Sequence, residues 1–192
     1  LIIADVSGKG IPAVLFTMVT QTLLKCAVRN LSSPARCLSE VNELLAEDNE
    51  TCVFVTVFYG ILDLRDGTFR YCNGGHNPPR IVRSNSQVDT LPTTGNVVLG
   101  VFSGHEYIDG EIRLAPGDSL FLYTDGITEA QNGGNEEFGE ERLDERLAGL
   151  NEATARDVVN DVIDAVHLFV EDTPQSDDIT CIALRFNALL ST

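Results

Sequence analysis

Apolar and polar positions repeat along this chain with two different periods, and the change of period predicts where helices and strands lie. Residues 1–4 form an apolar strand that ends at Asp5, and a turn with two glycines follows it. Apolar residues then recur at helical spacing over residues 12–29, where Pro12 suits the first turn of a helix. The face of this helix that we expect to be buried comprises Leu15, Val19, Thr22, Leu23, Cys26 and Ala27.

A second helix is predicted soon after the first. Ser33 has the side chain of a good N-cap residue, and Pro34 suits the first helical position. The apolar stripe of this helix comprises Leu38, Val41, Leu44 and Leu45. Two consecutive amphipathic helices indicate a helical layer on one side of a sheet.

From residue 53 onward the period becomes that of β-strands. A hairpin turn at Asp66-Gly67 joins two predicted strands, and a capping box of Thr154 and Asp157 opens a late amphipathic helix. The strands are expected at residues 53–64, 68–73, 80–83, 97–101, 107–114, 119–124 and 179–186, with a polar connection at 85–94 and a short helix at 140–150. This order predicts an α+β layered domain with mainly antiparallel sheets.

The charge of the chain limits its partners. Acidic residues outnumber basic ones by 29 to 13, which gives a net charge of −16 over 192 residues. A field of this sign repels phosphate backbones and anionic lipids, so we expect no nucleic acid and no membrane partner, and it favours divalent cations. We also expect no membrane insertion, because no apolar run approaches the roughly 20 residues of a span. The five cysteines form no C-x-x-C pair, which is typical of a reducing cytoplasm.

Acidic residues stand beside three of the apolar strands. Asp5 follows the first strand, Asp125 follows the strand at 119–124, and Asp177 and Asp178 precede the last strand. If these strand ends converge, the carboxylates would repel one another, and a hard cation such as Mg²⁺ or Mn²⁺ is the natural remedy. Each acidic residue could instead cap a local turn, and the residues by themselves leave both interpretations open.

Five segments in order carry a resemblance to a known family. They are residues 5–13 (DVSGKGIPA), 75–79 (GHNPP), 122–130 (LYTDGITEA), 138–139 (FG) and 177–180 (DDIT). Together they closely resemble the metal-dependent serine/threonine phosphatases of the PPM, or type-2C-like, family, in the bacterial SpoIIE/RsbU branch. The resemblance covers essentially the whole chain.

This resemblance implies a four-layer αββα sandwich of two mainly antiparallel sheets flanked by helices. It implies one phosphatase domain over residues 1–192 that lacks the family's first strands and forms the C-terminal part of a larger regulator. It also implies two Mn²⁺ or Mg²⁺ ions, with Asp5 bridging them, the carbonyl of Val6 on one of them, and Asp125 and Asp177 as further ligands. Asp178 is the second choice for the last ligand. The implied reaction is hydrolysis of phosphoserine or phosphothreonine by attack of a metal-bridged hydroxide.

Two basic residues within the matched motifs are expected to play different roles. Lys9 stands where this branch often has His, so no imidazole acts there, and Lys9 could pair with the phosphate or be solvated. His76 lies in a glycine–proline loop, where we expect a structural role with its ring bonded to backbone groups. The resemblance further implies a STAS-type anti-sigma-factor antagonist as the phosphorylated substrate, an upstream sensor or receiver domain, and a homodimer formed through the first two helices.

Two other classes of function compete with this hypothesis. A pseudophosphatase would dock a regulator without turnover, but all the candidate carboxylates are intact. A two-metal nuclease would also use the aspartates, but it conflicts with the net charge of −16 and with the lack of a basic groove.

Overall fold

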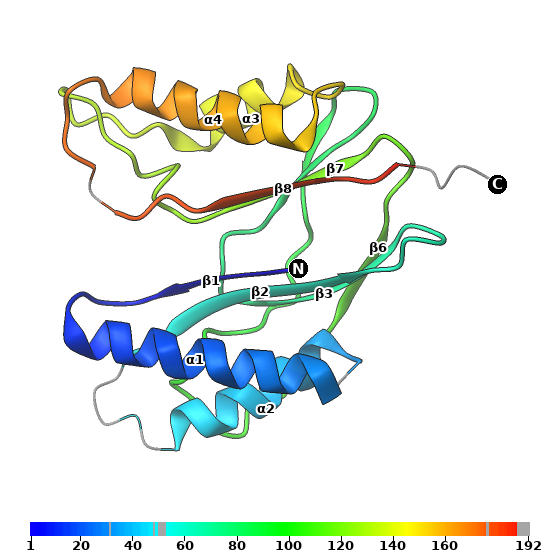
Figure 1. Cartoon of the computed structure of the whole chain (residues 1–192), viewed down its shortest axis with the longest axis vertical. Coiled ribbons are helices and arrows are strands. Elements are labelled where there is room, and N and C mark those ends of the chain that lie inside the picture. Colours follow the sequence, from blue (N-terminus) through cyan, green and yellow to red (C-terminus); the bar gives the residue numbers. More distant parts are fainter. Residues whose placement is uncertain (31, 48, 50–52, 176, 188–192) are drawn as a thin grey trace. The chain divides into compact units, whose positions relative to one another are not determined.

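The computed structural model describes residues 1–30, 32–47, 49, 53–175 and 177–187, so Cys52 and Ser176 lie outside the described residues. The chain divides into two compact units, and each contains a four-stranded sheet and a pair of helices (Figure 1). The first unit comprises residues 1–63, 68–76 and 92–112, and the second comprises 64–67, 77–91 and 113–192. The assignment of 1–192 to one phosphatase domain stays a prediction.

In the first unit the strand order is β1-β2-β3-β6, with β1 at Ile2–Val6, β2 at Val55–Leu62, β3 at Thr68–Gly74 and β6 at Gly110–Arg113. The β1–β2 and β2–β3 pairs are antiparallel. Gly67 has a φ of +78°, which confirms the predicted hairpin turn between β2 and β3. Helices α1 (Ile11–Asn30) and α2 (Pro34–Ala46) pack on one face of this sheet, so the predicted helical layer is confirmed.

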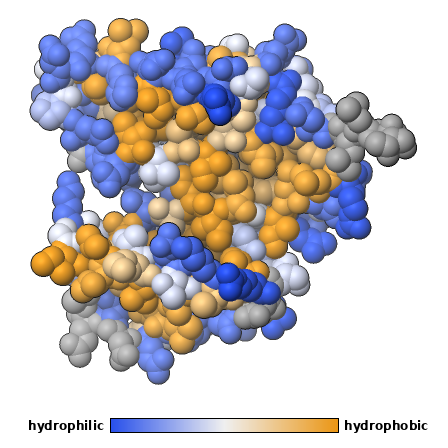
Figure 2. Space-filling view, in the orientation of Figure 1, coloured by the Kyte–Doolittle hydropathy of each residue, from blue (hydrophilic) through white to orange (hydrophobic). Residues whose placement is uncertain are grey.

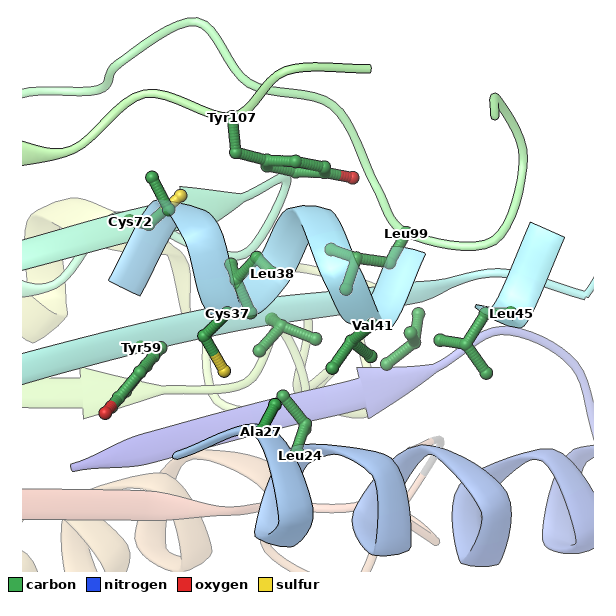
Figure 3. Packing of buried hydrophobic residues seen from close by; sticks show 13 residues of the cluster. Leu24, Ala27, Cys37, Leu38, Val41, Leu45, Tyr59, Cys72, Leu99 and Tyr107 are labelled. Carbon is green, nitrogen blue, oxygen red and sulfur yellow. The ribbon is translucent and has the colours of Figure 1, made fainter. Parts of the chain in front are cut away.

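The core of the first unit lies between this sheet and its helices. Figure 3 shows Leu24 and Ala27 of α1 and four side chains of α2 (Cys37, Leu38, Val41 and Leu45) directed into it. Burial raises the pKa of the Cys37 thiol to about 11 and that of Cys72 to about 12, which suits cysteines that fill space rather than react. Ser33 caps α2 by accepting the Arg36 N–H, as the sequence predicts. Leu44 of the predicted stripe is exposed, so that assignment is wrong.

The predicted buried face of α1 is largely wrong. Leu15 is 58% exposed and Val19 is 51% exposed, and Thr22 and Cys26 are exposed as well. Of the predicted face, Ala27 is buried and Leu23 is partly buried against the core, and the buried residues that the prediction missed are Ala13, Thr20 and Leu24. The helix has apolar residues on almost every side, so the spacing of these residues does not identify the face that is buried. Figure 2 shows the apolar surface that results, to which Ile11, Val14, Leu15, Met18 and Val19 contribute.

Helix α1 also corrects the expectation that no segment is long and apolar enough to cross a membrane. Residues 11–29 meet that test by length and composition, with 17% of the segment buried. Such a helix is weak evidence when it occurs alone, because core helices of soluble proteins and signal sequences pass the same test.

In the second unit the strand order is β5-β4-β7-β8, with β5 at Val88–Thr90, β4 at Arg80–Val82, β7 at Ser119–Tyr123 and β8 at Cys181–Arg185. All three neighbouring pairs are antiparallel. Helices α3 (Gly139–Ala148) and α4 (Ala155–Val170) pack against this sheet, with Phe121 and Tyr123 in the shared core. The Thr154 hydroxyl accepts the Asp157 N–H at 3.2 Å, which confirms Thr154 as the N-cap of α4, and the same hydroxyl donates to the Asp157 carboxylate at 2.7 Å.

The predicted strand at 97–101 is wrong, since it contributes only an isolated bridge between Leu99 and Val55. The side chain of Asn42 accepts the Gly100 N–H of this segment and donates to the carbonyl of Phe102, which follows it, so the Gly100 N–H is used outside a ladder. Residues 107–114 supply only the short β6, and the connection at 85–94 contains the additional strand β5. The predicted α+β class, with two antiparallel sheets each flanked by helices, is confirmed.

Candidate functional site

Strand β7 delivers Asp125 to the end of the second unit's sheet. The strand is apolar because it lies between β4 and β8, and Leu120 through Tyr123 are buried. After Thr124 the chain turns, and the Asp125 carbonyl accepts the Glu129 N–H at 2.8 Å and the Thr128 hydroxyl at 3.3 Å. The Asp125 side chain is half-buried, and its Oδ1 is buried without a hydrogen-bond partner among the described residues. A buried carboxylate oxygen in this state is costly unless another group neutralises it.

Thr124 fastens the segment before β8 to the end of β7. Its N–H donates to the Thr180 carbonyl at 3.0 Å, and its hydroxyl accepts the Thr180 N–H at 3.0 Å. The same hydroxyl donates to the Asp178 carbonyl at 3.0 Å. These three bonds hold the Asp177-Asp178 segment beside Asp125, although more than 50 residues separate them in the sequence.

Gly126 allows this approach. A Cβ atom added there would lie 2.4 Å from the Asp178 carbonyl oxygen and 3.4 Å from that of Asp177. The first distance is shorter than real Cβ contacts, so only glycine fits without displacing the neighbouring backbone. The glycine in the matched motif therefore serves close packing of the two acidic segments.

Glu129 is a fourth acidic residue at this place, and no role was predicted for it although the matched motif at residues 122–130 contains it. Burial raises the pKa of Glu129, and the negative charges of Asp125, Glu137 and Asp177 raise it further. The Asp177 side chain is exposed, and its Oδ1 accepts the Asp178 N–H at 2.8 Å. The second unit thus gathers a strongly negative group of carboxylates, the charge pattern that attracts divalent cations.

The remaining predicted residues lie in the first unit, at the end of β1. Asp5 is half-buried and is the register partner of Thr56, whose hydroxyl lies 3.4 Å from the Asp5 carbonyl oxygen. Val6 follows it and packs its side chain against the core below α1 and α2. Lys9 is exposed in the turn before α1, where Gly8 and Gly10 take positive φ values of +88° and +84°.

His76 is buried, as its structural role predicts, but its ring partner differs from the expectation. Nδ1 lies 2.8 Å from the Thr56 hydroxyl, a side-chain group, rather than a backbone group. The backbone of His76 bonds to the side chain of Asn73. No pattern in the sequence places Thr56 opposite Asp5, because this pairing depends on the register of β1 with β2.

The predicted ligands are chemically suited to a hard cation. They offer carboxylate oxygens and one main-chain carbonyl, the donors that Mg²⁺ and Mn²⁺ prefer, and the unpartnered Oδ1 of Asp125 fits a ligand oxygen. Within the described part of the chain, no three His, Cys, Asp or Glu side chains form a closed metal-binding group. Asp5 and Val6 belong to the first unit and Asp125, Asp177 and Asp178 to the second, so the convergence of all five stays a prediction.

The chain is similar to known bacterial proteins over almost its whole length. Protein IcfG of Synechocystis sp. is 26% identical over 214 residues, which cover 97% of this chain and 33% of IcfG. Phosphoserine phosphatase RsbU of Bacillus subtilis is 28% identical over 190 residues, which cover 95% of this chain and 54% of RsbU. The chain therefore spans about a third and about half of these two relatives.

The same fold occurs in a solved structure. The SiaA-PP2C domain of Pseudomonas aeruginosa matches with a TM-score of 0.85 at 20% identity, over 97% of this chain and 75% of that one. The family model described as Stage II sporulation protein E (SpoIIE) matches residues 1–187 of the 192. The chain belongs to the SpoIIE family, and its fold is that of the SiaA-PP2C domain.

Proposed function

We propose that this chain is a metal-dependent protein phosphatase domain that hydrolyses phosphoserine or phosphothreonine on a bacterial regulatory protein. The observation that carries the proposal is the arrangement around Asp125. Thr124 and Gly126 hold Asp177 and Asp178 beside it, and one of its carboxylate oxygens is buried without a hydrogen-bond partner. The RsbU relative, named a phosphoserine phosphatase, supports the same reaction class.

The ligand roles follow the donor atoms. Asp5, the carbonyl of Val6, Asp125 and Asp177 would hold two Mn²⁺ or Mg²⁺ ions, with Asp178 as the second choice for the last ligand. When bound, such ions supply positive charge for the phosphoryl oxygens and acidify water, so that a nucleophile is available near neutral pH. The β7 and β8 strand ends keep the acidic side chains in place, which lowers the cost of orienting them.

Electrostatics supports a second role for the cations. The chain carries a net charge of −16, and a phosphoserine adds about −1.5 to −2 at neutral pH, so the carboxylates alone repel the substrate. Two dications add four positive charges and offset most of the negative charge of these carboxylates. We expect the metal ions to tighten phosphosubstrate binding as well as to permit catalysis, with exposed Lys9 as the candidate protein contact to the phosphate.

The substrate and the partners are proposed on the family relationship. A STAS-type anti-sigma-factor antagonist is the proposed substrate, because the resemblance to the SpoIIE/RsbU branch implies it and the chain matches the SpoIIE family model and RsbU. An upstream sensor or receiver domain, a location in the cytoplasm and a homodimer through the first two helices complete the proposal. The exposed apolar side chains of α1, which include Ile11 and Met18, support the homodimer.

The experiment is a comparison of two charge-removing variants. Asp125→Asn should abolish turnover of a phosphoserine peptide at saturating Mn²⁺ with an unchanged fold, because an amide binds a dication more weakly than a carboxylate. Asp164→Asn, which removes an exposed carboxylate of α4, is the matched control and should keep the wild-type kcat. Wild-type turnover in Asp125→Asn would refute the assignment. Binding of the phosphopeptide by the unaltered chain without any turnover would favour a pseudophosphatase.

A further inference from the structure

A short series of contacting polar side chains lies on the face of the first sheet that α1 and α2 do not cover. Thr56 and Asp5 are register partners in the β1–β2 pair, so their side chains project from the same face. Val55 and Val57, on either side of Thr56, pack into the core below the helices. Because side chains alternate along a strand, Thr56 and Asp5 project from the opposite face.

His76 is the next member of this series of polar side chains. Its Nδ1 lies 2.8 Å from the Thr56 hydroxyl oxygen, and that oxygen lies 3.4 Å from the Asp5 carbonyl oxygen. The backbone of His76 is fixed on both of its polar groups by Asn73, whose side chain accepts the His76 N–H at 2.7 Å and donates to its carbonyl at 2.9 Å. His76 is 4% exposed and Asn73 is 6% exposed. The ring is therefore held rigidly. It contacts Thr56, and the Thr56 hydroxyl in turn lies beside the Asp5 carbonyl of β1.

The polar groups at this place have apolar neighbours. The adjacent pair on the same face, Ile3 and Phe58, is apolar, and both side chains are buried. Burying an imidazole, an amide and a hydroxyl is unfavourable unless each is bonded, whereas apolar side chains would fill the same space without that cost. The polar side chains of His76 and Thr56 lead to Asp5, a residue of the candidate site. This arrangement indicates that they act on the position of Asp5.

We infer that His76 is a positioning residue for Asp5. Its ring orients the Thr56 hydroxyl, and Thr56 in turn holds the end of β1 from which the Asp5 carboxylate projects. The inference rests on the proposed function, in which Asp5 holds a metal ion. The inference also specifies that the ring hydrogen of His76 lies on Nδ1. Thr56 has a single hydroxyl hydrogen, so it donates to the Asp5 carbonyl only when Nδ1 of His76 carries a hydrogen and donates to Thr56.

The test uses variants of Thr56, which stands between the two other groups. Thr56→Val removes the hydroxyl with little change of shape, and Thr56→Ser keeps it. Thr90→Val, on the exposed strand position of β5 in the second unit, is the matched control. The readouts are Mn²⁺ affinity by titration calorimetry, kcat and KM on a phosphoserine peptide, and the ring ¹⁵N shifts of His76.

We expect Thr56→Val to weaken Mn²⁺ binding and to lower kcat by about tenfold or more, as for other groups that orient metal ligands, with KM within about twofold. Thr56→Ser and Thr90→Val should stay within about threefold of the wild type in both quantities. The ¹⁵N shifts of wild-type His76 should show the Nδ1–H form, and Thr56→Val should shift the Nδ1 signal.

Three results would overturn the inference. They are wild-type Mn²⁺ affinity and kcat in Thr56→Val, an equal loss in Thr56→Val and Thr56→Ser, and a wild-type ring in the Nε2–H form. Failure of the proposed function is a different result. If the unaltered chain binds Mn²⁺ but turns over no phosphopeptide, the phosphatase proposal fails, whereas the inference is still decided by Mn²⁺ affinity and by the ¹⁵N shifts. If it binds no Mn²⁺, both fail.

Discussion

Gly126→Ala should damage the candidate site through one added methyl group. The new Cβ would lie 2.4 Å from the Asp178 carbonyl oxygen, and ordinary contact begins at 3.4 Å, so the two backbones must separate by about 1 Å. The Thr124 hydroxyl bonds this same Asp178 carbonyl, at 3.0 Å, and the separation would break or lengthen that bond. Gly126 does not have a positive φ, so backbone strain does not contribute to the effect.

The magnitudes follow from this displacement. Overpacking of this kind costs about 1–3 kcal/mol in the free energy of unfolding. Misplacing a catalytic group by about 1 Å lowers kcat by about 100-fold. We expect Gly126→Ala to lose both Mn²⁺ affinity and turnover while it remains folded at 25 °C, measured by titration calorimetry, by phosphopeptide hydrolysis and by urea unfolding.

Gly133→Ala is the control for this prediction. A Cβ at Gly133 would meet only the Thr173 hydroxyl oxygen, at 4.0 Å, so its substitution should change stability by less than about 0.5 kcal/mol. Mn²⁺ affinity and kcat should equal those of the wild type. The packing argument would be refuted if Gly126→Ala kept the wild-type Mn²⁺ affinity and kcat, or if Gly133→Ala lost as much as Gly126→Ala.

Arg80 is 2% exposed and forms ion pairs of 2.7 and 2.8 Å with α3, so urea unfolding should show a loss of about 2 kcal/mol in Arg80→Met. Arg70→Met, which breaks an exposed pair, should cost less than about 0.5 kcal/mol, and equal losses would contradict this reasoning. Leu24→Ala should cost about 3 kcal/mol and Leu15→Ala less than about 0.5, and the reverse order would restore the face of α1 predicted from the sequence. A phosphonate analogue of a phosphoserine peptide should bind about tenfold more tightly with Mn²⁺ than with EDTA, and equal binding would show that protein groups hold the phosphate.

The sequence defined elements best where pattern and local chemistry agreed. Ser33 with Pro34 and Thr154 with Asp157 fixed two helix starts, because capping depends on a few adjacent residues. The face of α1 could not be predicted, since apolar residues occur on almost all of its sides and tertiary packing selected Leu24. The segment at 97–101 has strand-like residues, but the side chain of Asn42 bonds its backbone.

The candidate site was predictable in its acidic residues but not in what holds them. Asp125 and Asp177 stood out because each borders an apolar strand, and their placement in one unit follows from the pairing of β7 with β8. The hydroxyl of Thr124 could not be assigned beforehand, because its partners are backbone groups more than 50 residues away. Thr56 and His76 were equally hidden, since their contact depends on the register of β1 with β2.

We predict that Asp5 of the first unit and Asp125 of the second hold the same metal ions. The most direct measurement is anomalous diffraction from crystals of the unaltered chain grown with Mn²⁺. We predict peaks about 2.1 Å from carboxylate oxygens of both Asp5 and Asp125, with Asp177 or Asp178 completing the ligands. Mn²⁺ bound by Asp125 and its neighbours alone, with the Asp5 carboxylate directed away into solvent, would contradict the claim.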